Sequence, residues 1–369
     1  MMDKLMYLVQ WGDSKEKAWS GTNWHLYKAL QNYLELVDID IPITPTPSFF
    51  QQLFNLKSDQ PDVGLRVTKQ GGKYAKTFLP KRDNITLLQF AENVFNKKDV
   101  RTYIYQDLSV SYLKFIVEND PQLFSFSGFQ DNPYSAISKR AKYQDAYYST
   151  CSGIFTMGKW LAKDMIERCH IKSSKVHAVG GGINIDSSLI DYSKKKGSKI
   201  LFVGRDFVRK GGYLVVDAFK KIRKKSKNVE LYVAGPIVNP INEDLDGYHF
   251  LGDCNYKETA EIFNLCDVYC MPSYFEAYGL VFIEALTFGL PVIGRNSFEM
   301  PYFIDEGETG MLLHEDNVDV LSDMIEDLLV NNDVKRNVRE RRDYFLSQYS
   351  WDGVAKRICS VIEEDYPSK

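Results

Sequence analysis

The chain lacks any long apolar run. Among its 369 residues there is no stretch of about 18 consecutive apolar side chains, the length that a membrane-spanning helix needs. The opening "MMDKLMYLVQWG" is a short apolar run that includes Asp3 and Lys4, so we expect a first β-strand there rather than a secretory signal. These features predict a protein that folds and works in the cytoplasm.

A strong net charge is also lacking. The 46 lysines and arginines are outnumbered by 49 aspartates and glutamates, which gives a net charge of -3. This balance argues against the basic surface of a nucleic-acid-binding protein. The densest basic run, "KKIRKKSK" (residues 220–227), is predicted to end an amphipathic helix on its solvated face.

The six cysteines show no paired spacing of the kind that zinc sites use. We expect all of them to be reduced thiols, mostly in the core, as is usual in the cytoplasm. They are Cys151, Cys169, Cys254, Cys266, Cys270 and Cys359. Nothing in this pattern predicts a metal site or a disulfide framework.

What the chain has is a regular alternation of strand-like and helix-like segments. In the second half, "KILFVG", "VELYVAG", "YHFLG", "DVYCMP", "PVIG" and "GMLL" are separated by amphipathic stretches of helical length. In the first half, "LMYLVQ", "RTYIYQD", "AYYSTCS" and "KVHAVGGG" have the same character, whereas residues 44–82 are hard to assign. Alternation of this kind predicts two doubly wound α/β domains with parallel sheets, and ligands beyond the carboxyl ends of the strands.

A basic loop follows one of these strand ends. In "GRDFVRKGG", Arg205, Arg209 and Lys210 precede two glycines and a predicted helix. Cations and a flexible backbone at a helix amino terminus suit a phosphate, because unpaired amides and the positive end of the helix dipole meet there. Cations in such a loop are equally common as solvated residues, so the fragment alone leaves both interpretations open.

Two glutamates eight residues apart flank another predicted strand–helix junction, in "EAYGLVFIE". Glu284 lies on an almost wholly apolar helix, and no neighbour three or four residues away can pair with it. An unpaired buried carboxylate costs roughly several kcal/mol. Glu284 should therefore either hold polar groups of a ligand or meet a partner elsewhere in the chain, and Glu276 should stand at the mouth of the helix. The alternative is an ordinary surface glutamate plus a loop glutamate.

These motifs together resemble the retaining glycosyltransferases of family 4. The E-x7-E pattern of "EAYGLVFIE" and the loop "VGRDFVRKGG" carry the resemblance. "WSGTNWHLYKAL" is similar to that family's first glycine-containing loop and helix, "KVHAVGGGIN" to its domain junction, and "YSWDGVAKRICSVIEE" to its last helix. The resemblance implies the GT-B fold, in which two Rossmann-like domains face a central cleft.

The resemblance also implies the domain organisation. Residues 1–184 would form the amino-terminal, acceptor-binding domain, and residues 185–346 would form the domain that binds the nucleotide-sugar donor. Residues 347–369 would form a helix that crosses back onto the amino-terminal domain.

Site residues follow from the same resemblance. Glu276 would contact the donor sugar, Glu284 the ribose, and Asp253 and Cys254 the base. Seven further residues of the donor domain would hold the diphosphate or shape the loops around it: Gly204, Arg205, Lys210, Ala277, Tyr278, Gly279 and Leu280. Gly21 and Thr22 would approach the same phosphates from the other domain as the cleft closes. Glu276, Arg205, Lys210 and Asp107 would be the catalytic group, and no metal or other cofactor is implied.

One position departs from the family pattern. Many members have a histidine where this chain has Asp107, after the strand "YIYQD". Asp107 could orient the acceptor, or it could cap the helix that starts near Ser109.

The implied function is transfer of a sugar from a UDP- or GDP-sugar to a hydroxyl of a glycan or lipid-linked acceptor, with retention of configuration. Bacterial surface polysaccharide or glycoconjugate synthesis is the implied setting, with possible peripheral contact to the inner membrane face, for instance through "KYAKTFLPKR". A glycosyltransferase-like subunit without turnover is the alternative from another class. A P-loop in "GIFTMGKW", where Trp160 replaces the usual Ser or Thr, and metal-dependent transfer through "DID" (residues 38–40) are weaker rivals.

Overall fold

A computed structural model describes residues 4–12, 14–41, 85–90, 100–194 and 197–365. The chain divides into two compact units. The first comprises Met1–Gly182 and Trp351–Lys369, and the second comprises Ile183–Ser350. Residues 44–82, which were hard to assign from the sequence, lie outside the described residues. They include the basic segment "KYAKTFLPKR".

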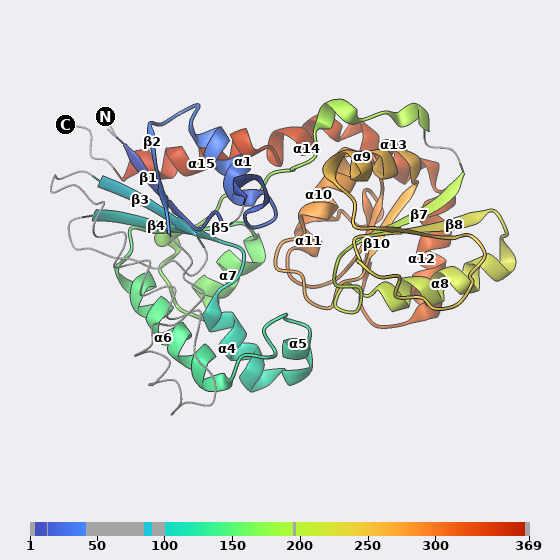
Figure 1. The fold of residues 1–369 in the computed structure, drawn as a ribbon, viewed down its shortest axis with the longest axis horizontal. Coiled ribbons are helices and arrows are strands. Elements are labelled where there is room, and N and C mark those ends of the chain that lie inside the picture. The colour runs from blue at the N-terminus through green and yellow to red at the C-terminus, as the bar shows by residue number, and fades with distance from the viewer. Residues whose placement is uncertain (1–3, 13, 42–84, 91–99, 195–196, 366–369) are drawn as a thin grey trace. The chain divides into compact units, whose positions relative to one another are not determined.

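The first unit is an α/β layer structure around a six-stranded parallel sheet, drawn in blue and green in Figure 1. Its strands are β1 (Leu5–Val9), β2 (Leu36–Asp40), β3 (Ile85–Phe90), β4 (Val100–Gln106), β5 (Gly153–Thr156) and β6 (Val176–Ala178). Its helices are α1 (Thr22–Leu30), α4 (Val110–Asn119), α5 (Pro121–Ser125), α6 (Tyr134–Thr150), α7 (Lys159–Glu167) and α15 (Trp351–Glu364), with short 3-10 turns at Lys15–Lys17 and Ser173–Lys175.

The second unit repeats this architecture with another six-stranded parallel sheet. Its strands are β7 (Ser198–Val203), β8 (Val229–Ala234), β9 (Tyr248–Gly252), β10 (Val268–Met271), β11 (Val292–Arg295) and β12 (Gly310–Leu313). Its helices are α8 (Gly212–Lys225), α9 (Tyr256–Leu265), α10 (Leu280–Thr287), α11 (Met300–Phe303), α12 (Val318–Val330), α13 (Asn332–Glu340) and α14 (Arg342–Gln348), after 3-10 turns at Ser187–Leu189 and Tyr192–Lys194.

Strand order identifies where each sheet can bind a ligand. The second sheet runs β12-β11-β10-β7-β8-β9, so the order reverses between β7 and β10. The first sheet runs β2-β1-β3-β4-β5-β6, with its reversal between β1 and β3. In open parallel sheets the loops that leave the two strands at such a switch point diverge and leave a crevice. The prediction of two doubly wound α/β sheets is confirmed.

One predicted strand is wrong. The segment "AYYSTCS" (residues 146–152) was expected to be extended because tyrosine and threonine favour strands. It is instead the last turn of α6 and the start of the following loop, and the strand begins at Gly153. Buried positions along α6 fall three or four residues apart, at Ile137, Arg140, Gln144 and Tyr148, which is the helical period.

The last helix packs within the first unit. α15 contacts α1, and the two lie side by side in Figure 1. Its inward face consists of Val354, Ala355, Ile358 and Ile362, which are all buried. A Cβ at Gly182 would lie 2.6 Å from the Trp351 ring, so only a glycine leaves room for that side chain.

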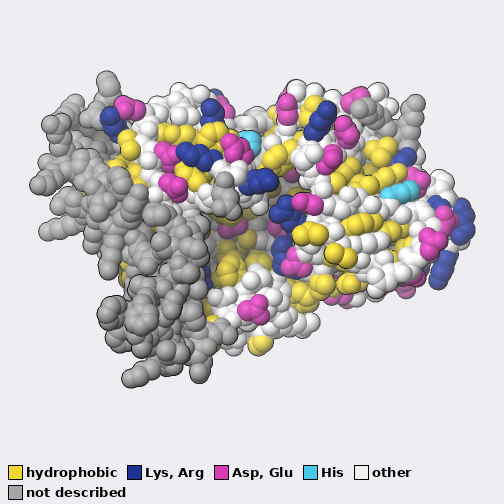
Figure 2. All heavy atoms as spheres, in the orientation of Figure 1, with side chains coloured by type: hydrophobic (Ala, Val, Ile, Leu, Met, Phe, Trp, Pro, Cys, Tyr) yellow, Lys and Arg dark blue, Asp and Glu magenta, His cyan; other side chains and the backbone are white. Residues whose placement is uncertain are grey.

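The basic run of residues 220–227 behaves as expected. It forms the end of α8, and Figure 2 shows basic side chains beside acidic ones at the outer edge of this unit, on the right. Lys221 pairs with Asp319, Arg223 with Asp246, and Lys225 with Glu326. These ion pairs offset much of the positive charge that the run would otherwise offer to a nucleic acid.

Most of the cysteines lie in the core, as the sequence predicted. All six cysteines are free thiols, and Cys151, Cys266, Cys270 and Cys359 are buried. Of the helices in the part of the chain that the structure describes, none is both long enough and apolar enough to cross a membrane.

The packing of α15 gives a first prediction. Ile358→Ala removes a fully buried side chain and should lower the free energy of unfolding by about 2–5 kcal/mol. The matched control is Val330→Ala, because Val330 is an aliphatic residue with 73% of its surface exposed, where the change should be within about 0.5 kcal/mol. Urea unfolding followed by circular dichroism measures both. Equal effects of the two substitutions would show that α15 is not part of the core of the first unit.

Candidate functional site

The candidate site lies at the switch point of the second sheet. β7 is followed by the basic loop, residues 204–211, which leads into α8. β10 is followed by residues 272–279, here called the Glu276 loop, which leads into α10. β7 and β10 are adjacent parallel strands, so both loops leave the same edge of the sheet. Topology alone therefore brings the two sequence motifs together.

Two glycines allow Lys210 to extend across the basic loop. A Cβ at Gly204 would lie 2.1 Å from Cδ of Lys210, so the lysine side chain occupies the space that the glycine leaves. Gly211 has a φ of +74°, and a Cβ there would lie 2.6 Å from the backbone oxygen of Pro272. These two positions let the basic loop approach the Glu276 loop closely, which larger residues would prevent.

Glu276 receives two cations from the basic loop. Its Oε2 is 3.0 Å from Nζ of Lys210 and 3.6 Å from a terminal nitrogen of Arg209. Only 12% of the Lys210 side chain and 15% of the Glu276 side chain are exposed, so this pair is largely shielded from solvent. Ion pairs in such surroundings are screened much less than surface pairs. Two of the predicted site residues are thus in direct contact.

Arginines hold the Glu276 loop from both sides. Arg209 donates to the backbone oxygen of Phe275 at 2.6 Å. From the end of β11, Arg295 donates to the backbone oxygens of Pro272 at 3.1 Å and Ser273 at 3.2 Å. The sequence motifs did not identify Arg295, although it is the last residue of strand β11 in the same sheet. Together the two guanidinium groups fix the backbone that presents Glu276.

The helix that follows, α10, begins at a left-handed turn. Gly279 is the residue before α10 and has a φ of +90° and a ψ of 58°, a left-handed conformation that favours glycine. The first amides of any α-helix have no partner within the helix, and its dipole is positive at this end. Tyr278 is buried and stacks edge-on against Phe303, which anchors this turn. Leu280 begins the helix and Ala277 precedes the turn.

Glu284 is buried, and it meets a partner elsewhere in the chain. Only 6% of it is exposed, and its Oε1 accepts a hydrogen bond of 3.0 Å from the backbone amide of Asn184. Burial raises the pKa of Glu284 to about 7, and the amides of Asn184 and Ile185 partly oppose that rise. The sequence left open whether Glu284 is a surface residue or meets a partner elsewhere in the chain. The structure shows the partner and excludes a surface position.

Arg205 lies apart from the Lys210–Glu276 pair. Its side chain is 78% exposed and pairs with Asp253, 3.1 Å away. Cys254 follows Asp253 after β9 and is partly buried, with its Sγ near the backbone oxygens of Leu251 and Gly252. The three residues lie at the same carboxyl edge of the sheet as the basic loop.

The other predicted residues belong to the first unit. Gly21, with a φ of +84°, precedes α1, and Thr22 is its buried first residue. Asp107 follows β4 and is half-buried, but Ser109 is the residue that caps α4, with its Oγ accepting from the amide of Tyr112. The N-cap residue of α4 is therefore Ser109 rather than Asp107.

Neither of the weaker rivals fits the geometry. Gly153 begins strand β5, with the ring of Tyr103 2.9 Å from where its Cβ would be, so "GIFTMGKW" does not form a phosphate-binding loop. Asp38 of the "DID" segment accepts from Nε1 of Trp11 and pairs with Lys15, and Asp40 accepts from the Trp11 amide.

The burial of Glu284 predicts a dependence of stability on pH. The native carboxyl keeps its proton up to about pH 7, whereas its ordinary pKa is 4.5, so the native state binds more protons between these values. The contribution of Glu284 is fully present below about pH 4.5 and is lost as the pH rises through 7, by about 3 kcal/mol. Urea unfolding of Glu284→Gln, which keeps an acceptor for Asn184, should lack this decline, whereas Glu315→Gln at an exposed position should keep it. If both variants decline like the native protein, Glu284 is ionised throughout.

Comparison with known proteins places these features in a family. Residues 190–345, which contain both loops, match the family described as glycosyl transferases group 1. A phosphatidyl-myo-inositol mannosyltransferase of Mycobacterium leprae (strain TN) is 24% identical over 336 residues, which cover 85% of this chain and 88% of that protein. For two other mycobacterial proteins of that name, the alignment spans 57% and 59% of their length.

Solved structures agree on the fold. Sucrose-phosphate synthase from Thermosynechococcus elongatus superposes with a TM-score of 0.69 at 16% identity, covering 98% of both chains. WaaG, a glycosyltransferase involved in lipopolysaccharide biosynthesis, gives a TM-score of 0.67 at 14% identity, with 97% of this chain and 99% of that chain covered. The chain is therefore a glycosyltransferase with the GT-B fold, and its residues 190–345 belong to the glycosyl transferases group 1.

Proposed function

We propose that the protein transfers a sugar from a nucleoside diphosphate sugar, UDP- or GDP-linked, to a hydroxyl of a glycan or lipid-linked acceptor with retention of anomeric configuration. The observation that carries the proposal is the shielded Lys210–Glu276 pair, 3.0 Å apart, beside the amino terminus of α10. A cation and the positive end of a helix dipole suit the diphosphate, and a carboxylate suits sugar hydroxyls.

Each candidate residue has a proposed task in donor binding. Lys210 and the amides of Tyr278, Gly279 and Leu280 hold the diphosphate, and Glu276 accepts from hydroxyls of the donor sugar. The second carboxylate oxygen of Glu284 accepts from the ribose, and Asp253 and Cys254 lie near the base. The residues around the phosphates are Arg205, Gly204, Ala277, Gly21 and Thr22.

The proposed chemistry depends on stabilising the leaving group. The bond from the anomeric carbon to the diphosphate breaks while the acceptor oxygen bonds to the same carbon, and the acceptor proton passes to a leaving phosphate oxygen. Lys210 and the α10 amides are in place before the reaction and stabilise the developing negative charge, which is usually the largest catalytic term. Asp107 would orient the acceptor. Such stabilisation by the protein alone would make a metal unnecessary.

Two names among the similar proteins support the acceptor class. One acts on phosphatidyl-myo-inositol and another takes part in lipopolysaccharide biosynthesis. By analogy we propose an acceptor in bacterial surface polysaccharide or glycoconjugate synthesis, and a cytoplasmic enzyme in peripheral contact with the inner membrane face.

Donor binding tests the site directly. Lys210→Ala should weaken UDP or GDP binding by about tenfold or more, because a charged hydrogen bond to phosphate is lost. Lys163→Ala, at an exposed position of α7, is the control and should leave affinity unchanged. A thermal-shift panel of UDP-, GDP-, ADP- and TDP-sugars first selects the nucleotide, since a ligand of the native state raises the apparent stability. Calorimetry then gives the affinities, and equal values for the two variants would refute the donor-site assignment.

The product tests the mechanism. With the selected donor and an acceptor, the anomeric carbon of the product should keep the donor's configuration, as measured by the proton coupling constant in nuclear magnetic resonance. Turnover should persist in EDTA. An inverted product would contradict retention, and a loss of turnover that added Mg²⁺ or Mn²⁺ restores would contradict catalysis without a metal.

A further inference from the structure

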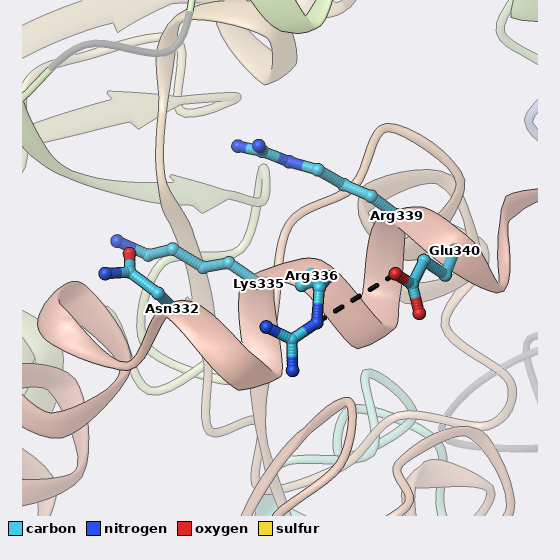
Figure 3. A pocket seen from close by; sticks show the side chains of 5 residues that line it. All are labelled: Asn332, Lys335, Arg336, Arg339 and Glu340. Atoms are coloured by element: carbon cyan, nitrogen blue, oxygen red, sulfur yellow. Dashed lines mark ion pairs between the residues drawn. The ribbon is translucent and has the colours of Figure 1, made fainter.

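A second basic site lies on helix α13, which carries none of the proposed donor-site residues. Asn332, Lys335, Arg336, Arg339 and Glu340 line a cavity of about 460 Å³, here called the α13 groove. All five come from α13, and Figure 3 shows Lys335 and Arg339 extending away from Arg336. Three cations and one carboxylate leave the α13 groove with an excess of positive charge.

Arg336 does not contribute to that excess. It pairs with Asp333 at 2.7 Å and lies 3.9 Å from Glu340, the ion pair drawn in Figure 3. Its side chain is 59% exposed. Arg336 is therefore compensated by its own helix, as i,i+3 and i,i+4 pairs usually are.

Lys335 and Arg339 differ from Arg336 because neither forms an ion pair with a carboxylate among the residues that the structure describes. The Lys335 ammonium donates to the backbone oxygen of Leu329. Arg339 lies over the ring of Tyr192, 5.5 Å from its centroid, and its buried Nε has no hydrogen-bond partner. Burial lowers the pKa of Lys335, nearby Asp267 opposes this effect, and Arg339 reinforces it. Two neighbouring cations are thus held together at a cost.

Other donors near Arg339 are also without partners. The hydroxyl of Tyr192 and Nε of Arg342 are buried and make no hydrogen bond. A Cβ at Gly289 would lie 2.8 Å from the Tyr192 ring and 3.0 Å from Cγ of Arg339, so the chain is closely packed on this side. Buried donors without partners are rare and call for an explanation.

We infer that the α13 groove is a binding site for a phosphate group, held between the ammonium of Lys335 and the guanidinium of Arg339. Phosphate carries close to two negative charges and offers several oxygens, so it can accept from both cations at once. It would offset the repulsion between them. An apolar ligand or a cation would not, so the chemistry favours this one class.

The test is calorimetric titration of inorganic phosphate into the full chain, at constant ionic strength adjusted with chloride. The double variant Lys335→Gln/Arg339→Gln should bind phosphate about tenfold more weakly or worse, because two charged hydrogen bonds are lost. Arg336→Gln is the matched control on the same helix and should bind as the native protein does. Lys210→Ala removes the donor-site cation and should also keep the binding.

Several results would overturn the inference. One is that the native protein does not bind phosphate at tens of millimolar, and another is that the double variant binds it as tightly as the native protein does. Loss of phosphate binding in Lys210→Ala would also overturn the inference. Lys335→Gln alone, checked for an unchanged thermal midpoint, replaces the double variant if that variant does not fold. Sedimentation with phosphatidylcholine vesicles containing phosphatidylglycerol separates two sources of the phosphate group. Binding to these vesicles that needs Lys335 and Arg339 indicates a lipid headgroup, and phosphate binding without it indicates a soluble phosphate.

Discussion

The arrangement of the second unit depends on satisfying one buried carboxylate. Glu284 lies inside α10 among apolar side chains, where an isolated charge would be too costly. The backbone amide of Asn184 satisfies it at 3.0 Å. This contact ties the middle of α10 to the first residues of the second unit, and the same helix begins at the left-handed turn of Gly279. The position of the helix amino terminus therefore depends on an interaction at the helix interior.

The Glu276 loop shows the same principle at the other end of α10. Arg209 and Arg295 hold its backbone oxygens, and Lys210 and Arg209 hold the Glu276 carboxylate. A loop held at so many points need not reorganise when a substrate arrives, and groups fixed in advance stabilise a developing charge more effectively than mobile ones. The close approach of the two loops requires glycine at position 211, and glycine at position 204 leaves room for the Lys210 side chain.

Much of this could be predicted because it is local. Strand ends, the glycines and the spacing of Glu276 and Glu284 are visible in the sequence, and topology then brings the two loops together. The wrong strand and the contacts that were not identified depend on parts of the chain outside a local window. "AYYSTCS" has strand-forming residues, but its helical period appears only when the preceding twelve residues are included. The partner of Glu284 is a backbone amide 100 residues away, which no side-chain pattern reveals, and Arg295 acts on backbone oxygens from another strand.

The pairing of each cation is more informative than the number of cations. The run at the end of α8 is the most basic segment, yet most of its cations pair with carboxylates. Lys210 faces a single shielded carboxylate, Glu276, whereas Arg209 pairs with Asp206 as well as with Glu276. Lys335 and Arg339 have no carboxylate in an ion pair within the described part of the chain. Because half-buried cations that form no ion pair repel each other at a cost to the fold, such a position favours a ligand that supplies negative charge.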